Sequence, residues 1–345
     1  MNTTATLAAA AIGFAVSAGS GYFLIPFLHK LHFGQTILDI GPSWHKNKQG
    51  TPTMGGFMFI IAILLAAVVG YFMLSGGENT GWYGTAVETA RYWGAILLAL
   101  AYGIIGFVDD YIKVIKKRNL GLTAVQKLIM QFVAAALYLL ILCTAGDTST
   151  VLIIPFLGQL DLGVLYFPLC TVGIVFIANS VNLTDGLDGL CGSVTCVAAL
   201  GFMAVSAVLG FGGINLLSTA LAAACLGFLV WNFYPARVFM GDTGSMFLGG
   251  LVCGLAFGLG MPLILAFLGI IYVCESLSVI LQVISFKTTG RRIFRMSPIH
   301  HHFEMCGLSE VRIDLTFAAV TAVGAVLAVL SVPVILTQME GPRLG

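Results

Sequence analysis

The stretch Asn182-Leu183-Thr184-Asp185-Gly186-Leu187-Asp188-Gly189 separates two apolar runs, at about 163–181 and 193–211. Each run approaches the roughly 20 residues that a helix needs to cross a bilayer about 30 Å thick. Leaving an aspartate in hydrocarbon costs about 2.5 to 3.5 kcal/mol, so Asp185 and Asp188 must be hydrated, paired or bound to a cation. If the segment is helical, the two carboxylates share one face, and the glycines beside them allow a ligand close to the backbone. The stretch predicts a site between two membrane spans, with a solvated turn as the alternative.

The composition extends this interpretation to the whole chain. Of 345 residues, 59% are hydrophobic and only 9% are charged, far below the roughly 25% charged residues of soluble domains. The apolar runs are continuous, whereas barrel strands would alternate. Turns at Gly210-Phe211-Gly212-Gly213 and Gly260-Met261-Pro262 divide two longer apolar segments. We therefore predict an all-α, polytopic integral membrane helical bundle, one domain over 1–345. Its ten transmembrane helices are expected at about 4–28, 54–75, 92–108, 127–146, 163–181, 193–211, 214–231, 244–260, 262–285 and 313–337.

The basic residues orient this bundle. Four loops on one side carry 14 of the 16 Lys and Arg residues. By the positive-inside rule that side is cytoplasmic, which places both termini outside. No basic residue precedes the first run, so we expect no cleavable signal peptide. The 14 residues are Lys30, Lys46, Lys48, Lys113, Lys116, Lys117, Arg118, Lys127, Arg237, Lys287, Arg291, Arg292, Arg295 and Arg312.

Charge and cysteine usage exclude two other classes. The net charge is +1 and the basic residues form no single stripe, so we expect no nucleic-acid partner. The eight cysteines lie mostly in apolar runs without a Cys-x-x-Cys pair, which indicates small core side chains and neither a zinc site nor a disulfide framework. On the external side, β-branched residues around Val151–Ile154 followed by Gly158 predict a short hairpin.

The predicted cytoplasmic loops carry two further acidic motifs. Asp109 and Asp110 repel each other, so a metal ion or the lysines that follow must stabilise them, unless they only balance those lysines. Lys127 opens the fourth run and can reach the same pocket. Asp242 stands among small residues that permit close packing around a ligand. Aromatic side chains just before it, Phe239 or Tyr234, could stack on a planar base.

Two more segments complete the candidate site. Thr53 is predicted to cap the second span, whose N-terminus with Lys48 nearby would suit an anion, although the lysines there could simply obey the charge rule. In the ninth loop, His300-His301-His302 offers donors to phosphate or a ligand to metal. Glu275 stands mid-span with no partner identifiable from the sequence, and both a catalytic role and a structural hydrogen bond to a neighbouring helix stay open for it. Gln282 lies nearer the cytoplasm and is better placed to meet a soluble substrate.

Taken together, these motifs resemble the MraY family of phospho-N-acetylmuramoyl-pentapeptide transferases, within the polyprenyl-phosphate N-acetylhexosamine 1-phosphate transferase superfamily. The resemblance covers essentially the whole chain, and the triple-histidine loop distinguishes this family from the related N-acetylglucosamine-phosphate transferases. Leu308 replaces an expected Trp and Cys191 a usual Ala, which affects local packing only. The motifs are Lys48-x-Gly50-Thr51-Pro52-Thr53-Met54-Gly55-Gly56, Phe107-x-Asp109-Asp110-Tyr111-x-Lys113, Asn182 to Leu190, Pro235-Ala236-x-Val238-Phe239-Met240-Gly241-Asp242-Thr243-Gly244-Ser245 and Ser297-Pro298-Ile299-His300-His301-His302-Phe303-Glu304.

The resemblance implies an activity. UDP-MurNAc-pentapeptide would react with undecaprenyl phosphate at the cytoplasmic face of the bacterial inner membrane, giving lipid I and UMP with Mg²⁺, in a homodimeric protein. Asp242 would hold the metal, with Asp109 and Asp110 as further metal ligands placed at the lipid phosphate, and Asp109 would accept the proton of that phosphate. The implied catalytic residues are Asp109, Asp110, Asp185, Asp242 and His301. The implied substrate-binding residues are Lys48, Thr53, Lys113, Lys127, Asn182, Leu183, Gly186, Asp188, Asn232, Phe239, Gln282, His300 and His302.

Several alternatives stay open at this point. A related N-acetylglucosamine-1-phosphate transferase or a transporter could share parts of the pattern, but a transporter would need several mid-membrane ionisable residues and repeated halves. An intramembrane aspartyl protease needs Gly-x-Gly-Asp, and position 239 is Phe. Whether Asp185 acts as a nucleophile in a two-step reaction is also open. The transferase assignment, with either a one-step or a two-step reaction, requires Asp109, Asp185 and Asp242 to lie close enough to contact one ligand.

Overall fold

A computed structural model describes the chain except residues 1, 32–47, 49, 77–81, 116–120 and 341–345, and its described part is almost entirely helical. The elements are α1 (Thr3–Lys30), α2 (Phe57–Ser75), α3 (Ala86–Ile115), α4 (Ala124–Thr144), β1 (Val151–Ile154), β2 (Gly158–Asp161), η2 (Gly163–Leu165), α5 (Tyr166–Thr184), α6 (Leu190–Leu209), α7 (Gly212–Asn232), α8 (Gly241–Gly258), η3 (Pro262–Ile264), α9 (Leu265–Leu268), α10 (Ile270–Thr289), α11 (Ile299–Met305) and α12 (Glu310–Glu340).

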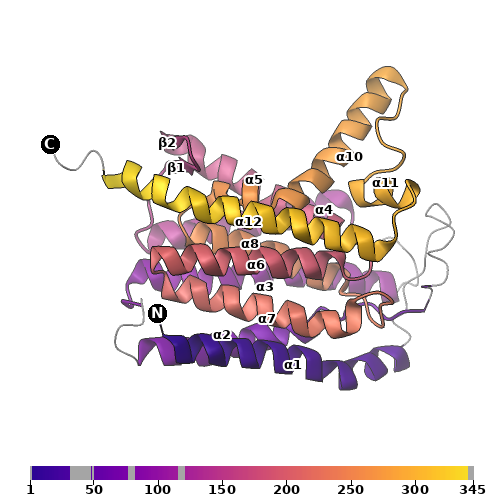
Figure 1. Cartoon of the computed structure of the whole chain (residues 1–345), viewed down its shortest axis with the longest axis horizontal. Helices are drawn as coiled ribbons and strands as arrows, with labels where there is room; N and C mark the ends of the chain where they lie inside the picture. Colours follow the sequence, from indigo (N-terminus) through magenta and orange to yellow (C-terminus); the bar gives the residue numbers. More distant parts are fainter. Residues whose placement is uncertain (1, 32–47, 49, 77–81, 116–120, 341–345) are drawn as a thin grey trace.

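Most of the long helices lie side by side in one bundle (Figure 1). Within the described residues, nine helices are long and apolar enough to cross a membrane: α1 to α7, α10 and α12. The predicted run 244–260 corresponds to α8, which is not among the nine, so the count of ten stays a prediction. The start of α1 and the end of α12 lie at the same end of the bundle, on the left of Figure 1.

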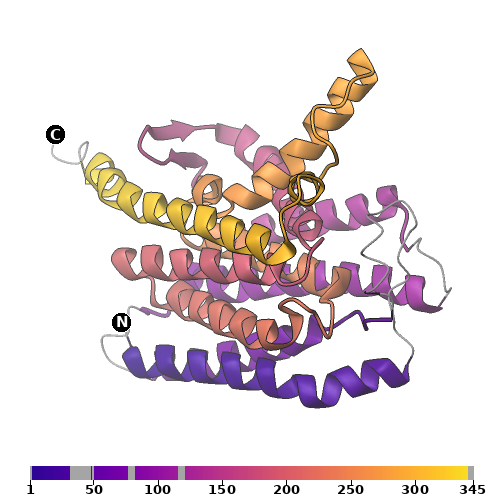
Figure 2. The ribbon, with the colours of Figure 1, turned by 45° about the vertical axis from the view of Figure 1, so that its right-hand side comes forward.

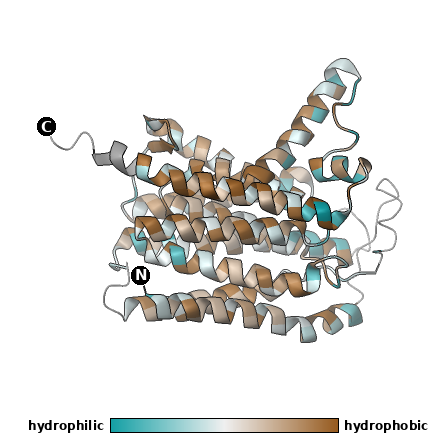
Figure 3. Cartoon of the chain, viewed as in Figure 1, coloured by the Kyte–Doolittle hydropathy of each residue, from teal (hydrophilic) through white to brown (hydrophobic). Residues whose placement is uncertain are grey.

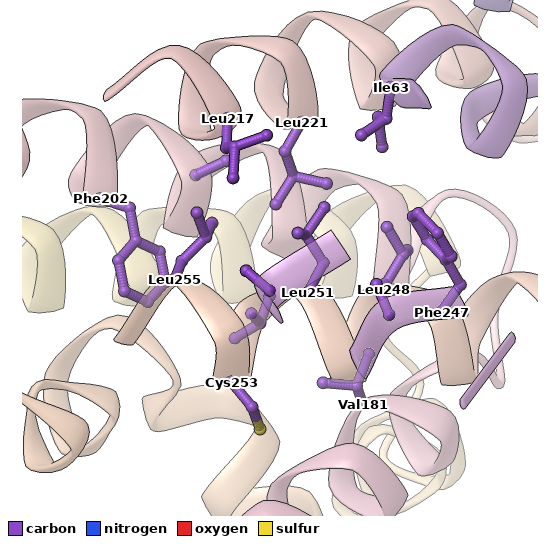
Figure 4. Close-up of a cluster of buried hydrophobic side chains, with 14 of the residues drawn as sticks. Ile63, Val181, Phe202, Leu217, Leu221, Phe247, Leu248, Leu251, Cys253 and Leu255 are labelled. Carbon is purple, nitrogen blue, oxygen red and sulfur yellow. The ribbon is translucent and has the colours of Figure 1, made fainter. Parts of the chain in front are cut away.

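The centre of the bundle is α8, because every residue from Thr243 to Gly258 is buried. Its glycines let neighbouring helices approach at backbone distance, as small residues do in membrane bundles. A Cβ on Gly254 would lie 2.6 Å from the Cα of Ala95 in α3, and one on Gly249 would lie 2.7 Å from the Cα of Ala178 in α5. Apolar side chains of α8 such as Leu251 complete the core (Figure 4).

The predicted breaks at Gly210 and Gly260 are confirmed, since both glycines have positive φ and follow the ends of α6 and α8. The hairpin is confirmed as well: β1 and β2 are antiparallel, with Val151 opposite Asp161. The ninth predicted run differs, because it is divided at Gly269 into η3, α9 and α10. Beyond this break, α10 projects from the bundle at an angle to the other helices (Figure 2).

The prediction that Thr53 caps α2 is wrong. The N-cap residue is Gly56, and no side chain caps the helix. The reason lies in the chain that precedes α8: the N–H groups of Gly55 and Gly56 donate to the carbonyls of Phe239 and Met240, at 2.8 and 3.1 Å. These backbone bonds replace the side-chain cap, and they occupy two N–H groups that the sequence offered to an anion. Lys46 lies outside the described residues.

Hydrophilic residues are frequent along the chain at the end of the bundle where α11 and the start of α12 lie (Figure 3). The C-terminal ends of α3 and α5 and the N-terminal ends of α2 and α8 meet at this end, as the contacts below show. All eight cysteines are free.

Candidate active site

Three aspartates meet where the C-terminal part of α3 crosses the start of α8. Asp109 and Asp110 lie near the C-terminal end of α3, in the part of the helix that extends beyond the predicted span. Asp242 is in the first turn of α8. Oxygen atoms of the three carboxylates lie within 4.8 Å of one another. A Cβ on Gly106 would lie 2.1 Å from the carbonyl oxygen of Asp242, so only glycine lets the two helices approach this closely.

Two lysines and an asparagine surround Asp242. Lys113 Nζ lies 3.0 Å and Lys127 Nζ 2.9 Å from Asp242 Oδ2, and Lys113 also lies 2.5 Å from Asp109 Oδ2. Asn182, at the end of α5, donates to Asp242 Oδ1 at 2.9 Å. The acidic motif of α3, the lysine of α4, the Asn182 stretch and the Asp242 motif therefore form one cluster, as the sequence predicted.

The Asp110 carboxylate connects α3 to the N-terminus of α8 by hydrogen bonds. Its Oδ2 accepts the backbone N–H of Thr243 at 2.8 Å and the Thr243 hydroxyl at 2.7 Å, and its Oδ1 accepts the N–H of Asp242 at 3.2 Å. Free N–H groups at a helix start favour a negative charge, so this carboxylate is held where the helix dipole stabilises it. Asp110 thereby fixes the position of Asp242 beside Asp109.

The donor set fits a hard divalent cation. Octahedral Mg²⁺ binds oxygen at about 2.0 to 2.1 Å, which places neighbouring ligand oxygens about 3 Å and opposite ones about 4 Å apart. Ligand oxygens of Asp109, Asp110 and Asp242 lie within 4.8 Å of one another, and like charges this close repel unless positive charge offsets them, as Lys113 does between Asp109 and Asp242. Each carboxylate oxygen can accept about two bonds, and two lysines already fill Asp242 Oδ2. An ion would thus be bound by the remaining oxygens, or would displace a lysine.

A second cluster joins the Lys48 loop to the Asp185–Gly189 turn and α12. Lys48 Nζ lies 2.7 Å from Asp188 Oδ1 and 2.6 Å from Glu310 Oε2. Burial lowers the pKa of Lys48, but the bonds and charges of the two carboxylates outweigh this and raise the pKa above its ordinary value of 10.5. Asp188 also accepts the N–H of Ala236 at 2.9 Å, and Asn232 accepts the N–H of Gly189 at 3.2 Å.

Asp185 lies between these two clusters. It is the C-cap residue of α5, and a turn follows it. The turn ends at Gly189, which has a φ of +80° and is the N-cap residue of α6. The condition for a shared helical face is therefore not met, and Asp185 and Asp188 have different surroundings. Burial raises the pKa of Asp185 well above its ordinary value, and the nearby charges of Asp242, Asp110 and Asp188 add to the shift.

The histidine segment forms α11 and packs against the same turn. A Cβ on Gly186 would lie 2.2 Å from His300 Nε2, so the imidazole lies directly on the Gly186 backbone. His301 Nδ1 lies 2.6 Å from Glu304 Oε2, and His302 Nδ1 accepts the N–H of Arg295 at 3.2 Å. The three histidines have different partners, and His300 lies against the Asp185–Gly189 turn.

Known proteins resemble this chain along nearly its whole length. Residues 92–260 match glycosyl transferase family 4. Curated proteins named phospho-N-acetylmuramoyl-pentapeptide-transferase are 45% identical to it in Clostridium botulinum (322 aligned residues, 92% of this chain and 93% of that protein) and 45% identical in Heliobacterium modesticaldum (328 residues, 94% and 96%). The protein of that name from Desulforudis audaxviator is also 45% identical, over 332 residues.

The chain belongs to the phospho-N-acetylmuramoyl-pentapeptide-transferase family. The predicted membership is thus confirmed, and the chain is a multi-pass membrane enzyme of the glycosyl-1-phosphate transferase type. The names of these relatives favour this activity over the N-acetylglucosamine-1-phosphate transferase alternative.

Four residues predicted for this phospho-N-acetylmuramoyl-pentapeptide-transferase site have side chains outside the hydrogen bonds and ion pairs that form the two charged clusters. A Cβ on Gly241 would lie 2.8 Å from Thr53 Oγ1, which places Thr53 beside the start of α8. Phe239 contributes its carbonyl to Gly55, and the Leu183 side chain is exposed. Gln282 binds the backbone of Ile293 and Phe294, so it holds the loop after α10 in place. Substrate contact by these four stays a prediction.

Two residues that shape the site had no role among the sequence-based predictions. Thr243 binds Asp110 through its N–H and hydroxyl, and it was part of the quoted motif without a role. Glu310 shares Lys48 with Asp188 and also accepts the N–H of Asp188 at 3.2 Å. Glu310 lies 262 positions from Lys48, and no local pattern connects the two.

Proposed function

We propose that the chain transfers phospho-MurNAc-pentapeptide from UDP-MurNAc-pentapeptide to undecaprenyl phosphate, giving lipid I and UMP. The observation that carries this proposal is the cluster of Asp109, Asp110 and Asp242 with Lys113 and Lys127 at one end of a membrane bundle. A phosphoryl transfer between two anionic substrates needs positive charge around both phosphates and an attacking oxygen held in line. This cluster provides carboxylates for a cation and two ammonium groups beside them.

We propose that the cation is Mg²⁺ and that Asp242, Asp109 and Asp110 hold it. When bound, it supplies Lewis-acid stabilisation of the charge on the phosphates. Lys113 and Lys127 add positive charge at the same point. Asp109 accepts a proton from the lipid phosphate, whose oxygen then forms a bond to the phosphorus attached to the sugar. The bond from that phosphorus to UMP breaks, and UMP leaves with the electron pair.

The sugar nucleotide binds along the turn after α5 and the loops that meet it. Lys48 and Asp188 are linked there, and His300 lies on Gly186, so the groups proposed to contact the substrate surround one turn. We place Asp185 and His301 next to the reacting phosphates. The further contacts proposed are Thr53, Asn182, Leu183, Asn232, Phe239, Gln282 and His302.

We further propose that this end faces the cytoplasm of a bacterial inner membrane and that the protein acts as a homodimer. By the sequence-based assignment, 14 of its 16 basic residues belong to the side that carries the acidic motifs. UDP-linked sugars are water-soluble, so the site must open to the aqueous compartment that holds them, while the lipid substrate enters from the membrane.

Release of UMP from UDP-MurNAc-pentapeptide in detergent, with undecaprenyl phosphate, tests the proposal. We expect turnover with Mg²⁺, loss of turnover in EDTA, and a drop of about 10²-fold or more in Asp242→Asn, consistent with the cost of removing one electrostatic contact at a transition state. Asp161→Asn, in the hairpin at the other end, serves as the control and should keep full activity. Unchanged turnover in Asp242→Asn would remove Asp242 from its role.

A further inference from the structure

Glu275 and His300 form a buried pair behind the proposed site. His300 Nδ1 lies 3.0 Å from Glu275 Oε1, and the two side chains are only 1% and 0% exposed. Glu275 comes from α10 and His300 from α11, so the contact joins the projecting helix to the histidine segment. The sequence offered no partner for Glu275, and the structure identifies one.

Each side chain of the pair has one polar atom without a hydrogen-bond partner. Glu275 Oε2 and His300 Nε2 are both buried and have no hydrogen-bond partner. Buried polar groups are nearly always paired, and a carboxylate inside a protein is costly when few donors reach it. A pair of this kind is weak evidence for a stabilising role, because an apolar replacement of similar volume is often neutral or stabilising. Its presence therefore calls for a functional explanation.

The geometry assigns a direction to the imidazole. An ionised carboxylate can only accept, so with Glu275 ionised the hydrogen of the contact is on Nδ1, and Nε2 is the edge directed at Gly186. A third group that holds a histidine in one tautomer and one orientation is a recurring device of active sites. Without Glu275, the ring could rotate about its side-chain bonds, and the backbone at Gly186 would lose the surface on which it packs.

We propose that Glu275 is a positioning residue: it orients His300, and through His300 it sets the backbone of the Asp185–Gly189 turn for the transfer reaction. This rests on the proposed function of that turn. In this role Glu275 itself contacts neither substrate. The effect of Glu275 passes through the imidazole of His300 to the backbone of Gly186. Gly186 lies between Asp185 and Asp188 in the turn, so its position sets where both carboxylates lie.

The test compares Glu275→Gln and Glu275→Asp with a matched control, in the UMP-release assay and in thermal unfolding of the full chain in detergent. We expect Glu275→Gln to lower kcat by about 10-fold or more while its Tm stays equal to that of the wild type or rises. Glu275→Asp, which keeps the carboxylate, should recover part of the lost kcat. Ser276→Ala is the control, because Ser276 is the next residue of α10 and the change removes its buried 2.6 Å contact with Ser180. It should change kcat by less than about twofold.

A double variant makes the test independent of any single result. If Glu275 acts through His300, His300→Asn and Glu275→Gln/His300→Asn should have equal activity, because the second change has nothing further to remove. Multiplied losses in the double variant would overturn the proposal, as would a parallel loss of Tm and kcat in Glu275→Gln, which indicates structural support only. Wild-type turnover is measured beside these variants, and its absence would contradict the proposed function instead.

Discussion

At the scale of single residues, Lys48 is the clearest case of a charge whose partners decide its behaviour. Its ammonium lies between two carboxylates that are 4% and 10% exposed, Asp188 and Glu310. Removal of the lysine leaves both acceptors without this donor and places their charges against each other. We expect Lys48→Met to lower the free energy of unfolding by about 1 to 3 kcal/mol, the cost of leaving buried acceptors unsatisfied. Lys48→Met/Glu310→Gln should recover part of that loss.

The pH dependence of this stabilisation follows from the raised pKa of Lys48. A base whose pKa is higher in the folded state stabilises the fold fully below its ordinary pKa of 10.5 and loses the effect as the pH rises past that value. The difference in Tm between wild type and Lys48→Met should therefore be constant from pH 7 to 9 and shrink above about pH 10.5. Lys287→Met, at an exposed position of α10, is the control and should stay within about 0.5 kcal/mol of wild type. An equal effect of both substitutions would contradict the argument.

At the scale of elements, the sequence predicted where most helices lie but not how they contact one another. Apolar runs and glycine turns located α6, α7 and the hairpin because these signals are local. The break at Gly269 is not visible in the same way, since Gly269 stands in an apolar run without a second turn residue. The Thr53 cap failed because carbonyls from a loop 184 positions away accept the N–H groups of Gly55 and Gly56. Glu275 and His300 were both noted, but only the fold brings them together.

The contact between α3 and α8 gives the prediction at this scale. Gly106→Ala places a methyl group 2.1 Å from a backbone oxygen of α8, which cannot move aside as a flexible side chain can. Overpacking of this kind costs about 1 to 3 kcal/mol. It should also separate Asp109 and Asp110 from Asp242, so we expect UMP release to fall by at least about 10-fold. Gly173→Ala, in α5 with no atom within 4 Å of the added Cβ, should retain both stability and activity. Normal turnover in Gly106→Ala would show that the cluster tolerates a wider spacing.

At the scale of the whole molecule, the acidic cluster is a point where separate parts of the chain are tied together. Asp109 and Asp110 come from α3, Lys127 from α4, Asn182 from α5 and Asp242 from α8. In an unfolded chain these groups are far apart, so the oxygens that could hold a cation meet only in the folded state. The same feature that suits the site to phosphoryl transfer therefore couples cation binding to the stability of the entire bundle.

This coupling predicts that Mg²⁺ raises the Tm of the protein without any substrate present. A ligand that binds only the folded state adds about 2.7 kcal/mol when its concentration is 100 times its Kd. We expect a Tm that rises with Mg²⁺ and returns to its starting value when EDTA is added in excess. In Asp109→Asn the shift should shrink, because one ligand has lost its charge, whereas Asp161→Asn at the opposite end should show the full wild-type shift. The same shift in Asp109→Asn as in wild type would mean that the ion binds elsewhere. Since the measurement needs no turnover, it separates the cation site from the reaction assigned to it.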